Sequence, residues 1–266
     1  MIAIVAVLFS ACDKTGELIQ KDISITQNIK GVIIEGPWEV TITQDNENNS
    51  AWVEYNVPNN KITVEQRPNG YLFIKVRHLN HYRNVKLRAT LKAEMLETID
   101  ASGAAGINIF GEFNSDTEID LSGASHLDGY WCEGKNTEII LSGASKIKNF
   151  SFFGEYMKVE LSGASQMDVK NSEFNRCKVN ASGASKFNAK GYAAETEFTG
   201  SGASYFYTFD LESDNLYIDL SGASYGEVTV NNSIKGTLSG ASTLKYKRAE
   251  NVNVDVTGAS TLKKVD

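Results

Sequence analysis

One tetrapeptide recurs nine times through the last two-thirds of this 266-residue chain at a nearly fixed spacing. Seven copies read Ser-Gly-Ala-Ser, the first copy ends in Ala105, and the last copy starts with Thr257. The copies begin 18 to 20 residues apart, at Ser102, Ser122, Ser142, Ser162, Ser182, Ser201, Ser221, Ser239 and Thr257. A period near 20 residues is typical of stacked units that are each too small to bury an apolar face alone. The repeat therefore predicts an elongated repeat protein.

Residues on both sides of the tetrapeptide alternate between apolar and polar, as in a strand with one buried face. Before one copy, the apolar Ile119 and Leu121 flank the polar Asp120. After the next copy, the polar Lys146 and Lys148 flank the apolar Ile147. Each unit is therefore predicted to be a strand, a corner and a second strand. We expect a third, looser strand and a second bend in the rest of each unit, often near glycines such as Gly111, Gly134, Gly154 and Gly191.

The small residues of the tetrapeptide suit a sharp corner. Glycine adopts φ > 0 without a Cβ clash, alanine fits the crowded inside of a bend, and serine hydroxyls bond backbone groups where a ladder breaks. We therefore predict that the glycine of every copy is a structural corner residue. These glycines are Gly103, Gly123, Gly143, Gly163, Gly183, Gly202, Gly222, Gly240 and Gly258.

Three repeat architectures have periods near this length. A right-handed parallel β-helix explains identical residues in register, because each corner lies about 4.8 Å above the previous one. An antiparallel hairpin array would place equivalent residues about 10 Å apart. Identical residues in successive repeats would then make little contact with one another. A leucine-rich repeat requires a leucine pattern that is absent. We predict an all-β protein whose residues 96–266 form a right-handed parallel β-helix.

The first third of the chain contains no copy of the tetrapeptide. Residues 1–11 form a short apolar run that fits a signal peptide rather than a membrane span. Residues 8–12 (Leu-Phe-Ser-Ala-Cys) resemble a bacterial lipobox, which predicts acylation of Cys12, a tether over residues 12–23, and export to the cell envelope. The alternatives are a clipped ordinary signal peptide and a buried strand. Residues 24–95 are strand-like, and form either an irregular extension of the solenoid or a β cap that covers its open end.

Composition narrows the function classes. The net charge of −7, with no basic stretch interleaved with aromatics, argues against a nucleic-acid partner. Cys132 and Cys177 stand at different offsets within their repeats, which disfavours a disulfide. No Ser/His/Asp set, phosphate-binding glycine loop or Cys-x-x-Cys motif is present, and the short units leave little room for long loops. We therefore predict a protein that is not an enzyme and needs no cofactor.

Asp100 and Asp120 are predicted to be neighbours on successive turns of the helix, roughly 5 Å apart. That separation is near the one that retaining glycosidases use, and two carboxylates could also hold Ca²⁺. The repeat itself brings such pairs together, so a solvated acidic column is the interpretation that we favour. Asp100 and Asp120 stay the candidate residues for a calcium site or a catalytic pair.

Outward aromatic residues offer the clearest lead to a binding site. Tyr205, Tyr207, Tyr217 and Tyr225 occupy polar-column positions of adjacent units. An exposed aromatic patch can stack on sugar rings or anchor a protein. The alternative is that these tyrosines are simply favourable strand residues, half covered by their neighbours.

The chain also resembles a known family, the putative autotransporter adhesin, head GIN domain family (DUF2807). The resemblance covers residues 24–266 and rests on the opening segment GVIIEGPWEVTITQ (31–44), on IDASGAAGIN (99–108) and on the recurring tetrapeptide. It implies a β-helix on the cell envelope of a Bacteroidetes-type bacterium. The expected function is a lipid-anchored surface that binds a glycan or an envelope or host protein. A structural element of the envelope and a carbohydrate-active enzyme are the alternatives.

Overall fold

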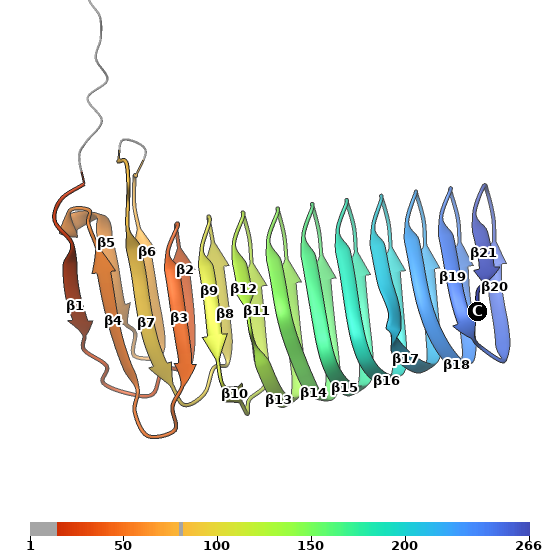
Figure 1. The fold of residues 1–266 in the computed structure, drawn as a ribbon, viewed down its shortest axis with the longest axis horizontal. Helices are drawn as coiled ribbons and strands as arrows, with labels where there is room; N and C mark the ends of the chain where they lie inside the picture. Colours follow the sequence, from red (N-terminus) through yellow and green to blue (C-terminus); the bar gives the residue numbers. More distant parts are fainter. Residues whose placement is uncertain (1–14, 80–81) are drawn as a thin grey trace, which may run out of the picture.

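The strands stack one above another into an elongated solenoid (Figure 1). The computed structural model describes residues 15–79 and 82–266. The strands before the repeats are β1 (Ile19–Ile23), β2 (Gly31–Glu35), β3 (Glu39–Gln44), β4 (Ser50–Tyr55), β5 (Ile62–Gln66), β6 (Tyr71–Val76) and β7 (Leu87–Ala93), and a short 3-10 helix spans Asn59–Lys61. The strands of the repeats are β8 (Thr98–Ser102), β9 (Gly106–Phe110), β10 (Glu112–Phe113), β11 (Thr117–Leu121), β12 (His126–Asp128), β13 (Trp131–Leu141), β14 (Lys146–Leu161), β15 (Gln166–Ala181), β16 (Lys186–Gly200), β17 (Tyr205–Leu220), β18 (Tyr225–Leu238), β19 (Thr243–Arg248), β20 (Asn251–Val256) and β21 (Thr261–Lys264).

Successive repeats pair in parallel and in register. Strand β13 aligns with β14 so that Ile139 faces Val159 and Leu141 faces Leu161. The same columns continue through β15, β16 and β17. The parallel β-helix predicted from the repeat is confirmed, because only parallel stacking places equivalent residues in adjacent strands.

Each tetrapeptide forms the tip that joins the two arms of a turn. The alanine N–H donates to the glycine carbonyl of the preceding tip, as from Ala184 to Gly163 at 2.7 Å. The last serine is buried in the seven copies from Ser125 to Ser242. At four tips its hydroxyl donates back to the carbonyl of the first serine, as from Ser185 Oγ to Ser182 at 2.8 Å. The nine tip glycines all have φ between 68° and 84°. The tip is thus part of the hydrogen-bonded ladder.

The far side of each turn differs from the sequence-based expectation. A third, separate strand was expected there, but from β14 to β18 a single strand of 14 to 16 residues runs from one tip to the next. The second bend is made by register shifts within these strands. Asn149 and Asn171 adopt φ of 52° and 46° near those shifts. Because the bulges bend the strand without ending it, the pairing continues around the bend.

The strands of residues 31–93 belong to the same ladder, but their order in the sheet differs from their order in the sequence. Strands β2 and β3 pair in parallel with β8 and β9 on one side. On their other side they pair in parallel with β6 and β7, which come later in the chain. Gly36 is the tip between β2 and β3, and its N–H donates to the carbonyl of Ser102 at 3.1 Å. Strands β4, β5 and β1 then close this end by antiparallel pairing.

The interior is filled by columns of aliphatic and aromatic side chains. Phe113, Tyr130 and Phe150 stack on successive turns with ring centroids 5.7 and 5.8 Å apart. The hydroxyl of the buried Tyr130 is satisfied by the hydroxyl of Thr117 at 2.8 Å. Cys132 and Cys177 are free thiols buried in this core, and burial raises the pKa of Cys177. Stacked apolar area therefore holds the turns together without cross-links.

The tip geometry predicts a large cost for a side chain at Gly183. A Cβ on Gly183 would lie 2.5 Å from the carbonyl oxygen of Gly163, at a φ of +71° that other residues adopt at a cost. Gly183→Ala is expected to lower the free energy of unfolding by about 1–3 kcal/mol, measured by urea denaturation. Gly16→Ala is the matched control, because a Cβ there meets nothing closer than 4.0 Å. Equal stability of the two variants would contradict this description of the tip.

Candidate functional site

Each turn presents two outward surfaces, one on either side of its tip. We call the outward side chains of the segments that leave the tips the trailing face. These segments are 126–128, 146–149, 166–170, 186–190, 205–210, 225–227, 243–247 and 261–263. We call the outward side chains of the segments that enter the tips the leading face. These segments are 98–100, 116–120, 136–140, 156–160, 176–180, 195–199, 215–219, 233–237 and 251–255.

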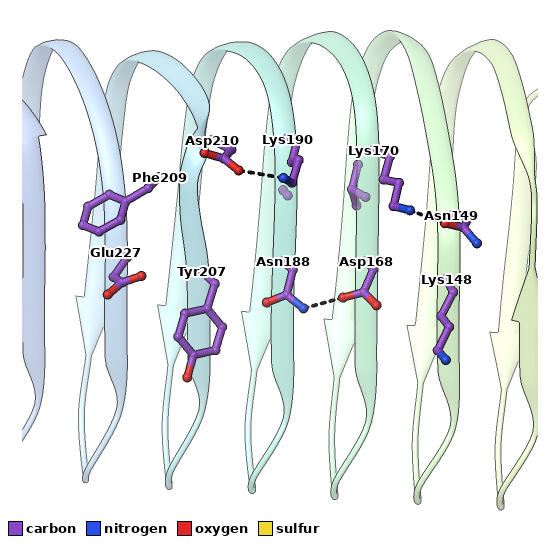
Figure 2. A pocket seen from close by; sticks show the side chains of 12 residues that line it. Lys148, Asn149, Asp168, Lys170, Asn188, Lys190, Tyr207, Phe209, Asp210 and Glu227 are labelled. Atoms are coloured by element: carbon purple, nitrogen blue, oxygen red, sulfur yellow. Dashed lines mark hydrogen bonds and ion pairs between the residues drawn. The ribbon is translucent and has the colours of Figure 1, made fainter.

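A groove of about 660 Å³ runs along the trailing face over strands β14 to β18. Figure 2 shows its side chains in two rows along the solenoid axis. One row consists of Lys148, Asp168, Asn188, Tyr207 and Glu227, and the other contains Asn149, Lys170, Lys190 and Asp210. Asp168, Asn188, Tyr207 and Glu227 are ladder partners on consecutive strands. A ligand lying along the axis would therefore meet a new polar or aromatic group at every turn.

The polar groups of the groove are held by one another. Asn188 donates to Asp168 Oδ1, and Lys170 donates to Asn149 Oδ1. Lys190 forms an ion pair with Asp210 at 2.8 Å. Amides and carboxylates held in this way can offer both donors and acceptors to a bound hydroxyl group.

One end of the groove is an aromatic platform. Tyr207 stacks on Tyr205 with ring centroids 5.8 Å apart and an interplanar angle of 11°. Tyr225 lies against both rings, at 6.3 and 6.0 Å. Burial raises the pKa of Tyr207, and the charge of Glu227 adds to that shift. The Tyr207 hydroxyl is therefore protonated at neutral pH and free to donate a hydrogen bond beside an exposed ring face.

The structure separates the four tyrosines that the sequence grouped together. Tyr205, Tyr207 and Tyr225 form one cluster on the trailing face. Tyr217 instead lies on the leading face, where its ladder partners are Glu197 and Lys235. The reason is that Tyr217 precedes its tip whereas the other three follow theirs, so that the two arms of the turn carry them apart.

Asp100 and Asp120 lie on the leading face, away from the groove. They are ladder partners on β8 and β11, and their column continues into Ile33 on one side and Ile140 on the other. Burial and the charges of Asp120 and Glu35 raise the pKa of Asp100, and burial raises the pKa of Asp120. Across residues 15–79 and 82–266, no three His, Cys, Asp or Glu side chains gather closely enough to hold a metal ion.

Most groove residues were missed by the sequence analysis, which singled out only Tyr207 among them. A positional signal was available, because Lys148, Asp168, Asn188, Tyr207 and Glu227 all stand six residues after the first serine of their tip. The second row carries no such signal, since the bulges near Asn149 and Asn171 shift its register. The predicted lipidation residue Cys12 lies outside the described residues.

Comparison with known protein families identifies the family of this chain. The family described as "putative auto-transporter adhesin, head GIN domain" matches residues 28–154 and 151–249. The chain belongs to this family. Membership indicates an adhesin-like role at the cell surface or envelope, which agrees with the resemblance noted in the sequence. Comparison with curated proteins found no match.

Several solved structures share the fold of this adhesin-family chain. A "putative adhesin" from Parabacteroides merdae is 15% identical, with a TM-score of 0.67 over 96% of this chain and 99% of that one. A "putative adhesin" from Parabacteroides distasonis is 17% identical, with a TM-score of 0.67 over 95% of this chain and 100% of that one. A "putative lipid binding protein" from Parabacteroides distasonis is 13% identical, with a TM-score of 0.72 over 96% of this chain and 99% of that one. At these identities the likeness is one of fold.

The acidic pair on the leading face predicts a pH-dependent cost to stability. A raised carboxyl pKa means that the folded state favours the protonated form, so the ionised pair destabilises the fold at neutral pH. The double variant Asp100→Asn, Asp120→Asn is expected to melt at a higher temperature than wild type at pH 7. This advantage should shrink as the pH falls through the raised folded-state pKa values and below 3.8, the ordinary aspartate value, where wild type is protonated too.

Asp255→Asn supplies the matched control. Asp255 occupies the same column at the last turn, where its ladder partner is Thr237 and not a second carboxylate. This variant should leave the melting temperature nearly unchanged at both pH values. A double variant that melts below wild type at pH 7 would show that the pair is stabilised by a contact other than those described.

Proposed function

We propose that this protein is a non-enzymatic, glycan-binding adhesin that a lipid on Cys12 anchors to the cell envelope. The observation that carries the proposal is the groove of the trailing face. There an exposed aromatic ring, Tyr207, stands beside Asp168 and Asn188 in one row. A sugar ring has an apolar face that packs on an aromatic ring, and hydroxyls that bond carboxylates and amides. The groove provides both kinds of partner side by side.

The shape of the groove supports a polymer rather than a small metabolite. Its residues come from five consecutive strands, β14 to β18, and repeat with the turns of the solenoid. Parallel strands lie about 4.8 Å apart, so the two rows extend over roughly 20 Å. An elongated ligand would gain contacts with each turn it crosses, whereas a single small molecule would use only a few of them.

Membership of an adhesin family supports the non-enzymatic part of the proposal. The carboxylates of the groove are engaged by neighbours: Asp210 by Lys190, Glu227 by Tyr225, and Asp168 by Asn188. The Asp100–Asp120 pair lies on the leading face and does not line the groove. A carbohydrate-active enzyme is therefore the weaker interpretation of the same surface.

Binding is tested on a glycan array with the full-length protein purified in detergent. We expect reproducible binding to a sugar class, weakened about tenfold or more by Tyr207→Ala, because the variant removes the exposed ring of the platform. Tyr217→Ala is the matched control, since Tyr217 is similarly exposed, at 48% against 38% for Tyr207, but lies on the leading face. Silence on the array, or equal loss in both variants, would contradict the proposed site.

The lipid anchor is tested separately. No helix within residues 15–79 and 82–266 is long and apolar enough to cross a membrane. If Cys12 carries the lipid, cells that express Cys12→Ala should lose incorporation of radiolabelled palmitate into the protein. Cys132→Ala and Cys177→Ala should keep it, because both thiols are buried in the core. Palmitate labelling that survives Cys12→Ala would overturn the anchor.

A further inference from the structure

The two faces of the solenoid carry opposite charge. The chain as a whole has a net charge of −7. The segments of the leading face contain four basic residues and ten carboxylates: Lys158, Arg176, Lys178 and Lys235, against Asp100, Asp116, Glu118, Asp120, Glu138, Glu160, Glu195, Glu197, Asp219 and Asp255. The segments of the trailing face contain eight lysines and four carboxylates: Lys146, Lys148, Lys170, Lys186, Lys190, Lys245, Lys247 and Lys263, against Asp128, Asp168, Asp210 and Glu227. The groove therefore lies on the one face that is positively charged.

Three lysines enter the groove from consecutive strands. Lys148 comes from β14, Lys170 from β15 and Lys190 from β16 (Figure 2). A chain that runs along the solenoid axis would meet one ammonium group on each of these turns. The aromatic platform of β17 follows on the next turn, where Tyr207 and Phe209 line the same groove. Cations on three consecutive turns are thus followed by aromatic rings on the next turn of one continuous surface.

Most of this positive charge is not neutralised within the protein. Lys190 pairs with Asp210 at 2.8 Å, and Lys245 lies 4.0 Å from Glu227. The other six trailing-face lysines form no ion pair within the described part of the chain. Lys170 donates to the neutral amide of Asn149, and Lys186 and Lys247 lie over the rings of Tyr205 and Phe209. These cations are available to a ligand.

We infer that the ligand of the groove is an acidic polysaccharide, with carboxylate or sulfate groups, that lies along the solenoid axis. The inference rests on the proposed glycan binding and specifies its chemical class. Lys148 and Lys170, which form no ion pair within the described residues, bind the anionic groups, and Asp168 and Asn188 bond the hydroxyls between them. Tyr207 packs against a ring face. The acidic leading face repels the same polymer, so binding is confined to one side of the molecule.

Anionic membranes and nucleic acids are poorer partners for this surface. Both present dense negative charge, which four interspersed carboxylates on the trailing face would oppose. A polysaccharide spaces its charges among hydroxyl groups, and Asp168 and Asn188 offer acceptors and donors for those hydroxyls. The mixture of lysines, amides, carboxylates and rings fits a polymer that is both charged and rich in hydroxyls.

The test compares one sugar backbone with and without its charge. Full-length protein in detergent is titrated with polygalacturonate and with the same polymer after complete methyl esterification. We expect binding to polygalacturonate, at least tenfold weaker binding after esterification, and loss of affinity as NaCl is raised, because exposed charges are screened. Vesicles of phosphatidylglycerol serve as a second anionic probe, and stronger binding to them than to polygalacturonate would overturn the inference.

Lysine variants test whether the groove supplies the positive charge that binds the polymer. Lys148→Gln, Lys170→Gln should weaken polygalacturonate binding at least tenfold. Lys135→Gln, Lys235→Gln, which removes the same number of charges away from the trailing face, should change it less than twofold. A thermal melt of each variant confirms that the fold is intact. Equal loss in the two double variants would overturn the inference.

Failure of this inference and failure of the proposed glycan binding would give different results. Equal binding of the charged and esterified polymers, lost in Tyr207→Ala, would overturn the acidic class while leaving the proposed glycan binding standing. Absence of binding to either polymer, together with silence on the glycan array, would overturn both.

Discussion

The hydrogen bond between consecutive tips is the constraint on which this structure depends. At each turn an alanine N–H donates to the glycine carbonyl of the tip before it, at 2.7 Å. That approach is close enough that a Cβ on the glycine would lie 2.5 to 2.7 Å from the same carbonyl in every tip from Gly123 to Gly258. The hydrogen-bonded ladder therefore continues through the tips without a break. Each tip must lie directly above the tip of the previous turn. The near-constant period follows from this, since an inserted residue has to be absorbed at the far bend.

A locked register has a consequence for function. Residues at equal distance from the tip form straight columns along the axis, so a surface can be built by choosing one column at a time. The groove on the trailing face is such a surface: one column contributes Asp168, Asn188, Tyr207 and Glu227 on four consecutive strands. Binding groups then lie on a rigid scaffold and need no loops to place them. The same rule allows two faces of one thin solenoid to carry opposite charge, because each arm of the turn has its own columns.

Much of this architecture could be predicted from the sequence. Residues that stack on one another on successive turns are the same residues that repeat at a fixed spacing in the sequence. The parallel β-helix, the strand–corner–strand unit and the placement of glycine at the corner all follow from one tetrapeptide. The order of the first turns could not be predicted: β2 and β3 lie between turns that follow them in the chain, and no repeated residue marks that crossover. Division of the chain at residues 95 and 96, and the roles of Cys12 and of the tyrosines, stay predictions. Tyr217 could have been separated from Tyr207 in advance, since their offsets from the tip place them on different arms. The second row of the groove could not, because it depends on bulges that break the column rule.

Hydrogen exchange at the tips tests the stacked-tip account most directly. A tip of four small residues at the surface would, as a free turn, exchange its amide protons within the time of an exposed loop. If the ladder passes through the tips, the amides of Ala144, Ala164, Ala184, Ala203 and Ala223 should be protected to nearly the same degree as those of the adjoining strands. Slow exchange at these alanines, resolved residue by residue by NMR, is the predicted result. Rapid exchange at the tips between protected strands would mean that the tips are ordinary exposed turns that merely connect the strands. That result would contradict the claim that hydrogen bonds between tips fix the register of the solenoid.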